Sequence, residues 1–171
     1  QIPEIGLEEY ETSKYIKSKL SEFKIEFKEG YANTGIVAHI KGAKGDSDKS
    51  IGLRADFDAL PMPEKNDFTH KSKNEGMMHA CGHDGHTTML LGAAKYLSQN
   101  NDFDGHVYFI FQPGEEGFAG GEKMIQDGMF TDFKIDEVYA LHNWPELPIG
   151  SIGVNSGPMM AAVDEFDIIV K

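Results

Sequence analysis

The residues with the clearest chemical potential lie in one short stretch, His79-Ala80-Cys81-Gly82-His83-Asp84-Gly85-His86. It contains the only cysteine of the chain, three of its seven histidines and one aspartate. Thiolate sulfur and imidazole nitrogen are donors that transition metals prefer. The alternative is a polar loop in front of a helix, with histidines that bond only to the backbone. That alternative usually holds for an isolated histidine, whereas a Cys-Gly-His-Asp cluster leading into a helix favours a metal site. The helix N-terminus would also favour the thiolate form of Cys81.

Further polar residues lie at the ends of predicted strands or just after them, which is where ligands bind in open α/β sheets. These residues are Asp56, Asp58, Glu115, Glu116 and His142. Adjacent side chains point in different directions, so one of the two glutamates can bind a metal while the other acts as a base. Asp58 can bind a metal directly or orient a ligand. The plainer interpretations are turn aspartates, a solvated acidic turn and a structural histidine.

Together these residues form a donor set for a transition ion such as zinc, manganese, cobalt or nickel: Cys81, His83, Glu116 and His142. Such an ion lowers the pKa of bound water and polarises a carbonyl group. Glu115 is not part of this ligand set, so it can take the proton from that water. The pattern therefore predicts metal-assisted hydrolysis of an acyl bond. Two alternatives stay open, namely a catalytically inactive metal-binding or interaction domain and an enzyme in which Cys81 is the nucleophile.

The elements that position these residues alternate between strands and helices, which predicts an α/β fold with a mixed, mostly parallel sheet flanked by helices. Predicted helices cover residues 7–23, 87–97 and 121–126, and predicted strands cover 35–40, 49–55, 105–112, 136–142, 149–154 and 164–171. The nearly continuous apolar run over 105–112 predicts a strand buried on both faces. The polar, glycine-bearing residues 41–48 predict a hairpin tip between the strands over 35–40 and 49–55.

Composition excludes several classes of partner. The formal net charge of -12 argues against nucleic acid and against an anionic membrane surface. The sequence shows no apolar run long enough to span a bilayer, and we expect no signal peptide. A single cysteine cannot form an internal disulfide, so we expect a reducing, cytoplasmic location. Because the chain starts at Gln1 instead of Met and stops inside a predicted strand, we expect a fragment of a longer protein.

Six stretches along the chain resemble the zinc-dependent amidohydrolases that include hippurate hydrolase, N-acetyl-amino-acid deacetylases and auxin-conjugate hydrolases, within the aminoacylase and carboxypeptidase superfamily. The stretches are Pro3–Glu9 (PEIGLEE), Leu53–Pro61 (LRADFDALP), Met78–Thr87 (MHACGHDGHT), Gln112–Gly117 (QPGEEG), Ala140–Pro145 (ALHNWP) and Gly157–Ala162 (GPMMAA). No single stretch is specific, but the combination is. The family commonly has alanine at the position of Gly114, which is a mild departure.

The resemblance implies the N-terminal part of a zinc-exopeptidase-like catalytic domain over residues 1–162, with residues 163–171 beginning a smaller inserted α/β domain. It implies two divalent metal ions, a general base at Glu115, and an aspartate at Asp58 that orients a ligand. The implied ligand positions are Cys81, His83, Glu116 and His142. The implied reaction converts an N-acyl amino acid, of acetyl or benzoyl type, into a carboxylate and a free amino acid. A further histidine ligand would lie outside this chain, and the full-length protein would be a homodimer or larger.

Overall fold

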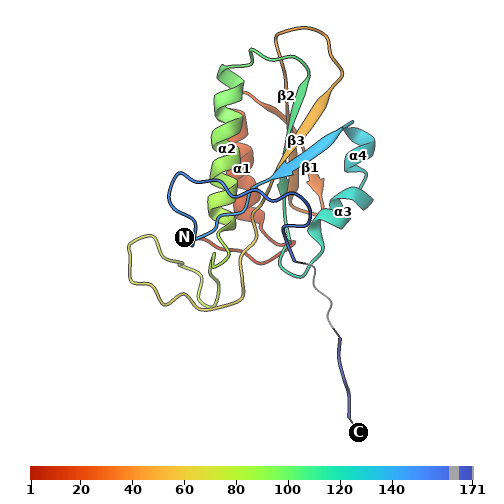
Figure 1. Ribbon diagram of the computed structural model, residues 1–171. Coiled ribbons are helices and arrows are strands. Elements are labelled where there is room, and N and C mark those ends of the chain that lie inside the picture. The colour runs from red at the N-terminus through yellow and green to blue at the C-terminus, as the bar shows by residue number, and fades with distance from the viewer. Residues whose placement is uncertain (162–165, 171) are drawn as a thin grey trace.

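The computed structural model describes residues 1–161 and 166–170, and it shows one sheet with helices on both faces (Figure 1). Its elements in chain order are α1 (Tyr10–Glu22), β1 (Glu26–Tyr31), β2 (Gly35–Lys41), β3 (Ser50–Asp56), α2 (His83–Gln99), β4 (His106–Gln112), α3 (Gly120–Gln126), α4 (Met129–Asp132) and β5 (Glu137–Ala140). The predicted α/β fold is therefore confirmed. Within the described part of the chain, no helix has the length and apolar character needed to cross a membrane.

The strands lie in the order β1-β2-β4-β3-β5. β3 runs parallel to β4 and β5, whereas β2 runs antiparallel to β1 and β4, so the sheet is mixed as predicted. β4 occupies the centre, and its residues Phe109–Phe111 are all buried. This agrees with the strand buried on both faces that the apolar run over 105–112 predicted.

Two hydrophobic cores hold the layers together, one on each face of the sheet. On one face, α1 and α2 pack against β2, β3 and β4; the buried side chains there include Ile16, Leu20, Leu90, Ala94, Phe109 and Phe111. On the other face, Met124 of α3 and Met129 of α4 pack against Val37 and Ile110. Successive side chains along β2 and β4 therefore pack alternately into the two cores. This alternation fixes the register of both strands.

The predicted hairpin between β2 and β3 is wrong, because β4 lies between them. The loop after β2 bonds instead to the segment that precedes β4. The N–H groups of Gly42 and Lys44 donate to the carbonyl oxygens of Gly105 and Phe103. The apolar residues of β4 need cover on both faces, so β4 takes the central position and separates two strands that are neighbours in sequence.

Other differences concern the ends and the less apolar elements. Helix α2 begins at His83, earlier than the predicted start at Thr87, so the chemically rich stretch enters its first turn. β1 and α4 were not predicted; β1 is mostly exposed, as befits an edge strand. Residues 149–154 form a turn and irregular chain instead of a strand. The predicted strand over 164–171 lies partly outside the described residues, and residues 166–170 have no regular structure.

Candidate metal centre

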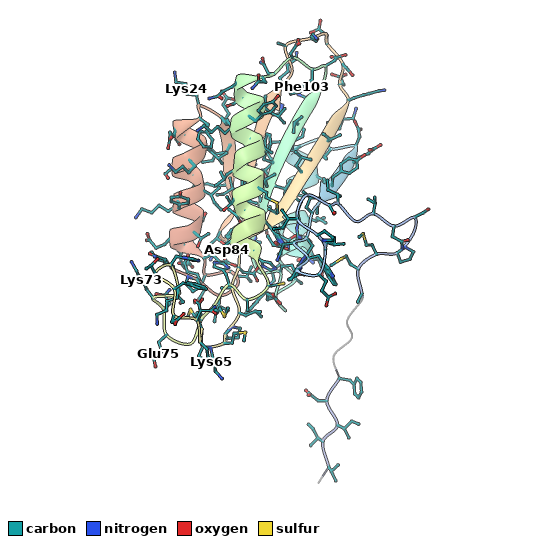
Figure 2. The ribbon with its side chains drawn as sticks, turned by 60° about the vertical axis from the view of Figure 1, so that its left-hand side comes forward. Lys24, Lys65, Lys73, Glu75, Asp84 and Phe103 are labelled. Atoms are coloured by element: carbon teal, nitrogen blue, oxygen red, sulfur yellow. The ribbon has the colours of Figure 1, made fainter. Side chains whose placement is uncertain are left out.

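Three loops bring polar side chains to one edge of the sheet, next to the N-terminal end of α2. Because β3, β4 and β5 are parallel, their carboxyl ends share this edge. The loops after these strands carry Asp58, the Glu115-Glu116 pair and His142, respectively. In Figure 2 the label of Asp84 marks the end of α2 that faces these loops. The prediction that the strand ends deliver the candidate site to one edge is confirmed.

His83 lies at the centre of these side chains, and its side chain is only 1% exposed. Its Nδ1 donates a hydrogen bond to Oδ1 of Asp58 over 3.0 Å, which leaves the lone pair on Nε2. Nε2 is buried and has no hydrogen-bond partner among residues 1–161 and 166–170. Carboxylate oxygens of Asp56, Glu116 and Glu115 lie 3.7, 3.8 and 3.9 Å from it. A buried acceptor among other acceptors is unfavourable unless a proton or a cation lies between them.

The other three predicted metal ligands, Cys81, Glu116 and His142, lie around His83. Three groups of side chains that could hold a metal ion share this histidine, with ligand atoms within 4.8 Å of one another: Cys81–His83–His142, Asp56–His83–His86 and His83–Glu115–Glu116. Sγ of Cys81 is 3.4 Å from Nε2 of His142. Nδ1 of His142 donates to the carbonyl oxygen of Asn143 over 2.7 Å, so the lone pair of Nε2 faces the site. This set of sulfur, nitrogen and oxygen donors, which includes the buried Nε2 of His83, fits a transition ion.

The Glu115-Glu116 pair differs from the prediction that its two carboxylates point apart. Both lie within 4 Å of the same imidazole nitrogen, so that prediction is wrong. Alternation holds for an extended strand, whereas this pair lies in a turn between Gly114 and Gly117, whose φ angles are 57° and 79°. The N–H of Glu116 donates to Oδ2 of Asp58 over 2.8 Å. One buried carboxylate therefore holds both the central imidazole ring and this turn.

The electrostatics of the site arise from burial and from close charges. Burial alone disfavours the charged forms of both His83 and Asp58, but their mutual hydrogen bond and other nearby groups outweigh it. The pKa of His83 is therefore raised and the pKa of Asp58 is lowered. Burial, together with the charges of Asp56 and Glu116, raises the pKa of Glu115. The concentration of carboxylates at one point favours a bound cation.

The prediction that the helix N-terminus favours the thiolate of Cys81 is wrong for the protein without metal. Burial, followed by the charge and hydrogen bond of Glu116, raises the pKa of the Cys81 thiol to about 11. Burial and full negative charges at short range together outweigh the partial positive charge of the helix end. A coordinated metal ion reverses this balance, because a thiol that binds metal loses its proton.

Two residues without a predicted role, His86 and Asn143, also belong to this cluster. Nδ1 of His86 donates to Oδ1 of Asp56 over 2.7 Å, and its Nε2 accepts the backbone N–H of Asn143 over 2.9 Å. Asn143 directly follows His142, so His86 holds the loop after β5 against α2. The spacing of His83 and His86, three residues apart on one helix, was the signal in the sequence for this shared face.

An α/β sheet with cysteine, histidine and carboxylate donors at the carboxyl ends of its strands defines a metal-binding domain of the zinc-exopeptidase type. The sequence model of peptidase family M20/M25/M40 matches residues 52–168, and the chain belongs to this family.

Three similar proteins agree with this assignment. Hippurate hydrolase of Campylobacter jejuni is 49% identical over 98% of this chain and 43% of its own length. N-acetyl-L-cysteine deacetylase of Bacillus subtilis is 45% identical over the whole chain and 40% of its own length. The crystal structure of the Bacillus subtilis YXEP protein, described as a dinuclear metal binding peptidase from the M20 family, superposes with a TM-score of 0.86. It is 42% identical, and the match covers 92% of this chain and 43% of that one. The chain thus spans less than half the length of these relatives.

Proposed function

We propose that the full-length protein uses two divalent metal ions to hydrolyse the amide bond of N-acyl amino acids of acetyl or benzoyl type. The observation that carries this proposal is the buried Nε2 of His83, which has no hydrogen-bond partner in the described part of the chain and lies where sulfur, imidazole and carboxylate donors meet. Two matched relatives are named as a hippurate hydrolase and an N-acetyl-L-cysteine deacetylase, and a third is described as a dinuclear metal binding peptidase. These names support the substrate class and the number of ions.

In this proposal the ligands from this chain are Cys81, His83, Glu116 and His142, and the ions are zinc, manganese, cobalt or nickel. When bound, such ions lower the pKa of a water molecule and polarise the acyl carbonyl group. Asp58 keeps Nδ1 of His83 protonated and so directs the lone pair of Nε2 into the site.

Glu115 is the proposed general base. Its Oε2 lies 3.9 Å from Nε2 of His83, and its side chain is 44% exposed, so both the site and the solvent side can reach it. Glu115 takes a proton from the attacking water, whose oxygen bonds to the acyl carbon. It passes the proton to the amide nitrogen as the C–N bond breaks. The products are a carboxylate and a free amino acid.

The test is the Glu115→Gln variant of the full-length protein, assayed with N-acetyl and N-benzoyl amino acids. Loss of a general base lowers kcat by about 10²- to 10⁴-fold, while the metal content, measured by elemental analysis, stays unchanged. Glu122→Gln, at an exposed glutamate of α3, is the matched control and should retain wild-type activity. Retained activity in Glu115→Gln would contradict the role of the base.

Two other outcomes separate the alternatives. A wild-type protein that binds two metal ions but hydrolyses no member of an acyl amino acid panel would be an inactive metal-binding domain. Activity that survives a chelator would favour Cys81 as a nucleophile. We expect a chelator to abolish activity and added metal to restore it.

The same proposal includes the domain organisation. Residues 1–162 are assigned to the catalytic domain and residues 163–171 to the start of a smaller inserted α/β domain. The family model matches residues 52–168 and so extends across the proposed boundary. The proposal also places the full-length protein in the cytoplasm as a homodimer or larger assembly; light scattering of the purified protein tests the assembly.

A further inference from the structure

Glu9 is a completely buried acidic residue whose side chain lies outside the metal donors described above. It is 0% exposed and immediately precedes α1, yet its carboxylate makes no capping bond to that helix. Burial raises the pKa of Glu9, because the charged form loses its hydration. A buried carboxylate that does not cap its own helix calls for another structural reason.

The carboxylate of Glu9 accepts three hydrogen bonds from three different parts of the chain. The N–H groups of Leu7 and Gly114 donate to Oε1 over 3.0 and 2.9 Å. The hydroxyl group of Thr34 donates to Oε2 over 2.7 Å. Glu9 therefore joins the N-terminal segment and the turn before β2 to the loop after β4.

The hydrogen bond to Gly114 fixes the backbone next to the proposed base, because Gly114 immediately precedes Glu115. The N-terminal segment also packs on this loop, since a Cβ atom at Gly6 would lie 2.9 Å from Cα of Gly114. Gly114 has a φ of 57°, so its N–H direction depends on a turn that few residues adopt. On the other side of Glu115, the N–H of Glu116 donates to Asp58.

We propose that Glu9 is a positioning residue for Glu115, holding the N–H of Gly114 while Asp58 holds the N–H of Glu116. The base is thus fixed from both sides by buried carboxylates, which set the direction of its side chain without touching the substrate. This inference rests on the proposed role of Glu115. If it holds, the N-terminal segment that contains Glu9, which precedes every strand of the sheet in sequence, affects the rate of catalysis.

Three variants separate the effects of the individual hydrogen bonds to Glu9. Glu9→Gln keeps an oxygen that can accept both backbone N–H groups, and its amide can donate to the hydroxyl oxygen of Thr34. Glu9→Ala leaves the buried N–H of Gly114 without its acceptor. Thr34→Val is the matched control, because it removes a hydrogen bond from the same carboxylate but leaves the bond to Gly114.

The variants are compared in the full-length, metal-loaded protein by kinetics with an N-acetyl amino acid and by metal analysis. For Glu9→Ala we expect kcat to fall by about 100-fold, as for a catalytic group displaced by ~1 Å, with KM changed by less than about threefold. We expect Glu9→Gln and Thr34→Val to stay within about threefold of the wild type in kcat. Metal content should be unchanged in all three.

Amide hydrogen exchange, measured by mass spectrometry in the metal-free and metal-loaded protein, gives a readout that does not depend on activity. In Glu9→Ala, exchange over residues 113–119 should be at least about tenfold faster than in the wild type. It should be unchanged in Glu9→Gln and Thr34→Val. If Glu9→Ala does not fold, Glu9→Asp replaces it, since its shorter side chain withdraws the oxygen from Gly114 and should give the same pattern.

Wild-type kcat in Glu9→Ala, an equal loss of kcat in Thr34→Val, or unchanged exchange over residues 113–119 would each overturn the proposal. Failure of the proposed function gives a different pattern, in which wild-type protein hydrolyses no acyl amino acid. The exchange comparison then decides by itself whether Glu9 holds the loop of Glu115.

Discussion

The buried pair of Asp58 and His83 makes a pH-dependent contribution to stability that the variant Asp58→Asn should remove. Asp58 is fully buried and accepts hydrogen bonds from Nδ1 of His83 and from the N–H of Glu116. An asparagine of the same shape has one oxygen, so only one of these two donors keeps an acceptor. The other donor then faces the NH₂ group, and the negative charge that stabilises protonated His83 is lost.

The sign of the pH dependence is set by the two pKa shifts. The pKa of Asp58 is lowered from 3.8, so its contribution is present above that value and is lost as the pH falls through the lower folded value. The pKa of His83 is raised from 6.5, so its contribution is complete below that value and is lost as the pH rises through the higher folded value. In the metal-free protein, the ion pair therefore stabilises the fold most between about pH 4 and pH 6.5.

The size of the stability loss in Asp58→Asn depends on the burial of the pair. At about pH 5.5 the variant loses one partner of a buried ion pair, which costs about 3–5 kcal/mol in the free energy of unfolding. At an alkaline pH above the folded pKa of His83, where the imidazole is neutral, the loss is that of an unsatisfied buried donor, about 1–3 kcal/mol. The difference between wild type and variant should thus be larger at the lower pH by about 2 kcal/mol.

Urea unfolding of the metal-free protein, monitored by circular dichroism at both pH values, measures these differences. The control is Asp102→Asn, because the Asp102 side chain is 74% exposed and forms a surface ion pair with Lys44. It should leave the pH dependence unchanged. An equal loss of stability at the two pH values in Asp58→Asn, or a larger loss at the higher pH, would refute the electrostatic reasoning.

Two further predictions concern the stretch that contains Cys81. Since the pKa of Cys81 is raised to about 11, alkylation of this single cysteine in the metal-free protein should accelerate about tenfold per pH unit up to that value; a plateau near pH 8.5, measured by mass spectrometry, would contradict this. The second concerns Gly82, whose φ is 96° and where a Cβ atom would lie 2.5 Å from Oδ1 of Asn143. Gly82→Ala should lower the free energy of unfolding by about 1–2 kcal/mol, measured by urea titration. It should also weaken zinc affinity, measured by zinc titration. The control Gly85→Ala, in α2 with nothing within 4 Å, should be neutral or stabilising; equal effects in both variants would contradict the clash.

Much of the candidate site could be predicted from local sequence. Cys81 and His83 are close in the chain, so their proximity needs no tertiary information. Glu116 follows one predicted strand and His142 ends another, and the carboxyl ends of parallel strands lie at the same edge of a sheet. The direction of the two glutamates could not be predicted, because it depends on a turn with positive φ angles and not on strand alternation.

The roles of Glu9 and His86 required the folded structure. Near a helix start, an acidic residue such as Glu9 usually faces solvent or the helix dipole. Its burial arises because the loop of Gly114, more than a hundred residues later in the chain, packs on it. The bond between His86 and the backbone of Asn143 also joins segments far apart in sequence.

The sequence by itself determined the α/β class, the buried central strand and the identity of the metal-type donors, because apolar periodicity and side-chain chemistry are local properties. Only the tertiary structure decided that β4 separates β2 from β3, that His83 is the point where all the donors meet, and that Glu9 reaches the loop of Glu115. Strand order and long-range hydrogen bonds depend on which surfaces bury each other best, and this competition involves the whole chain. The stretch around Cys81 thus indicates a metal site, but the tertiary structure brings the other donors to it.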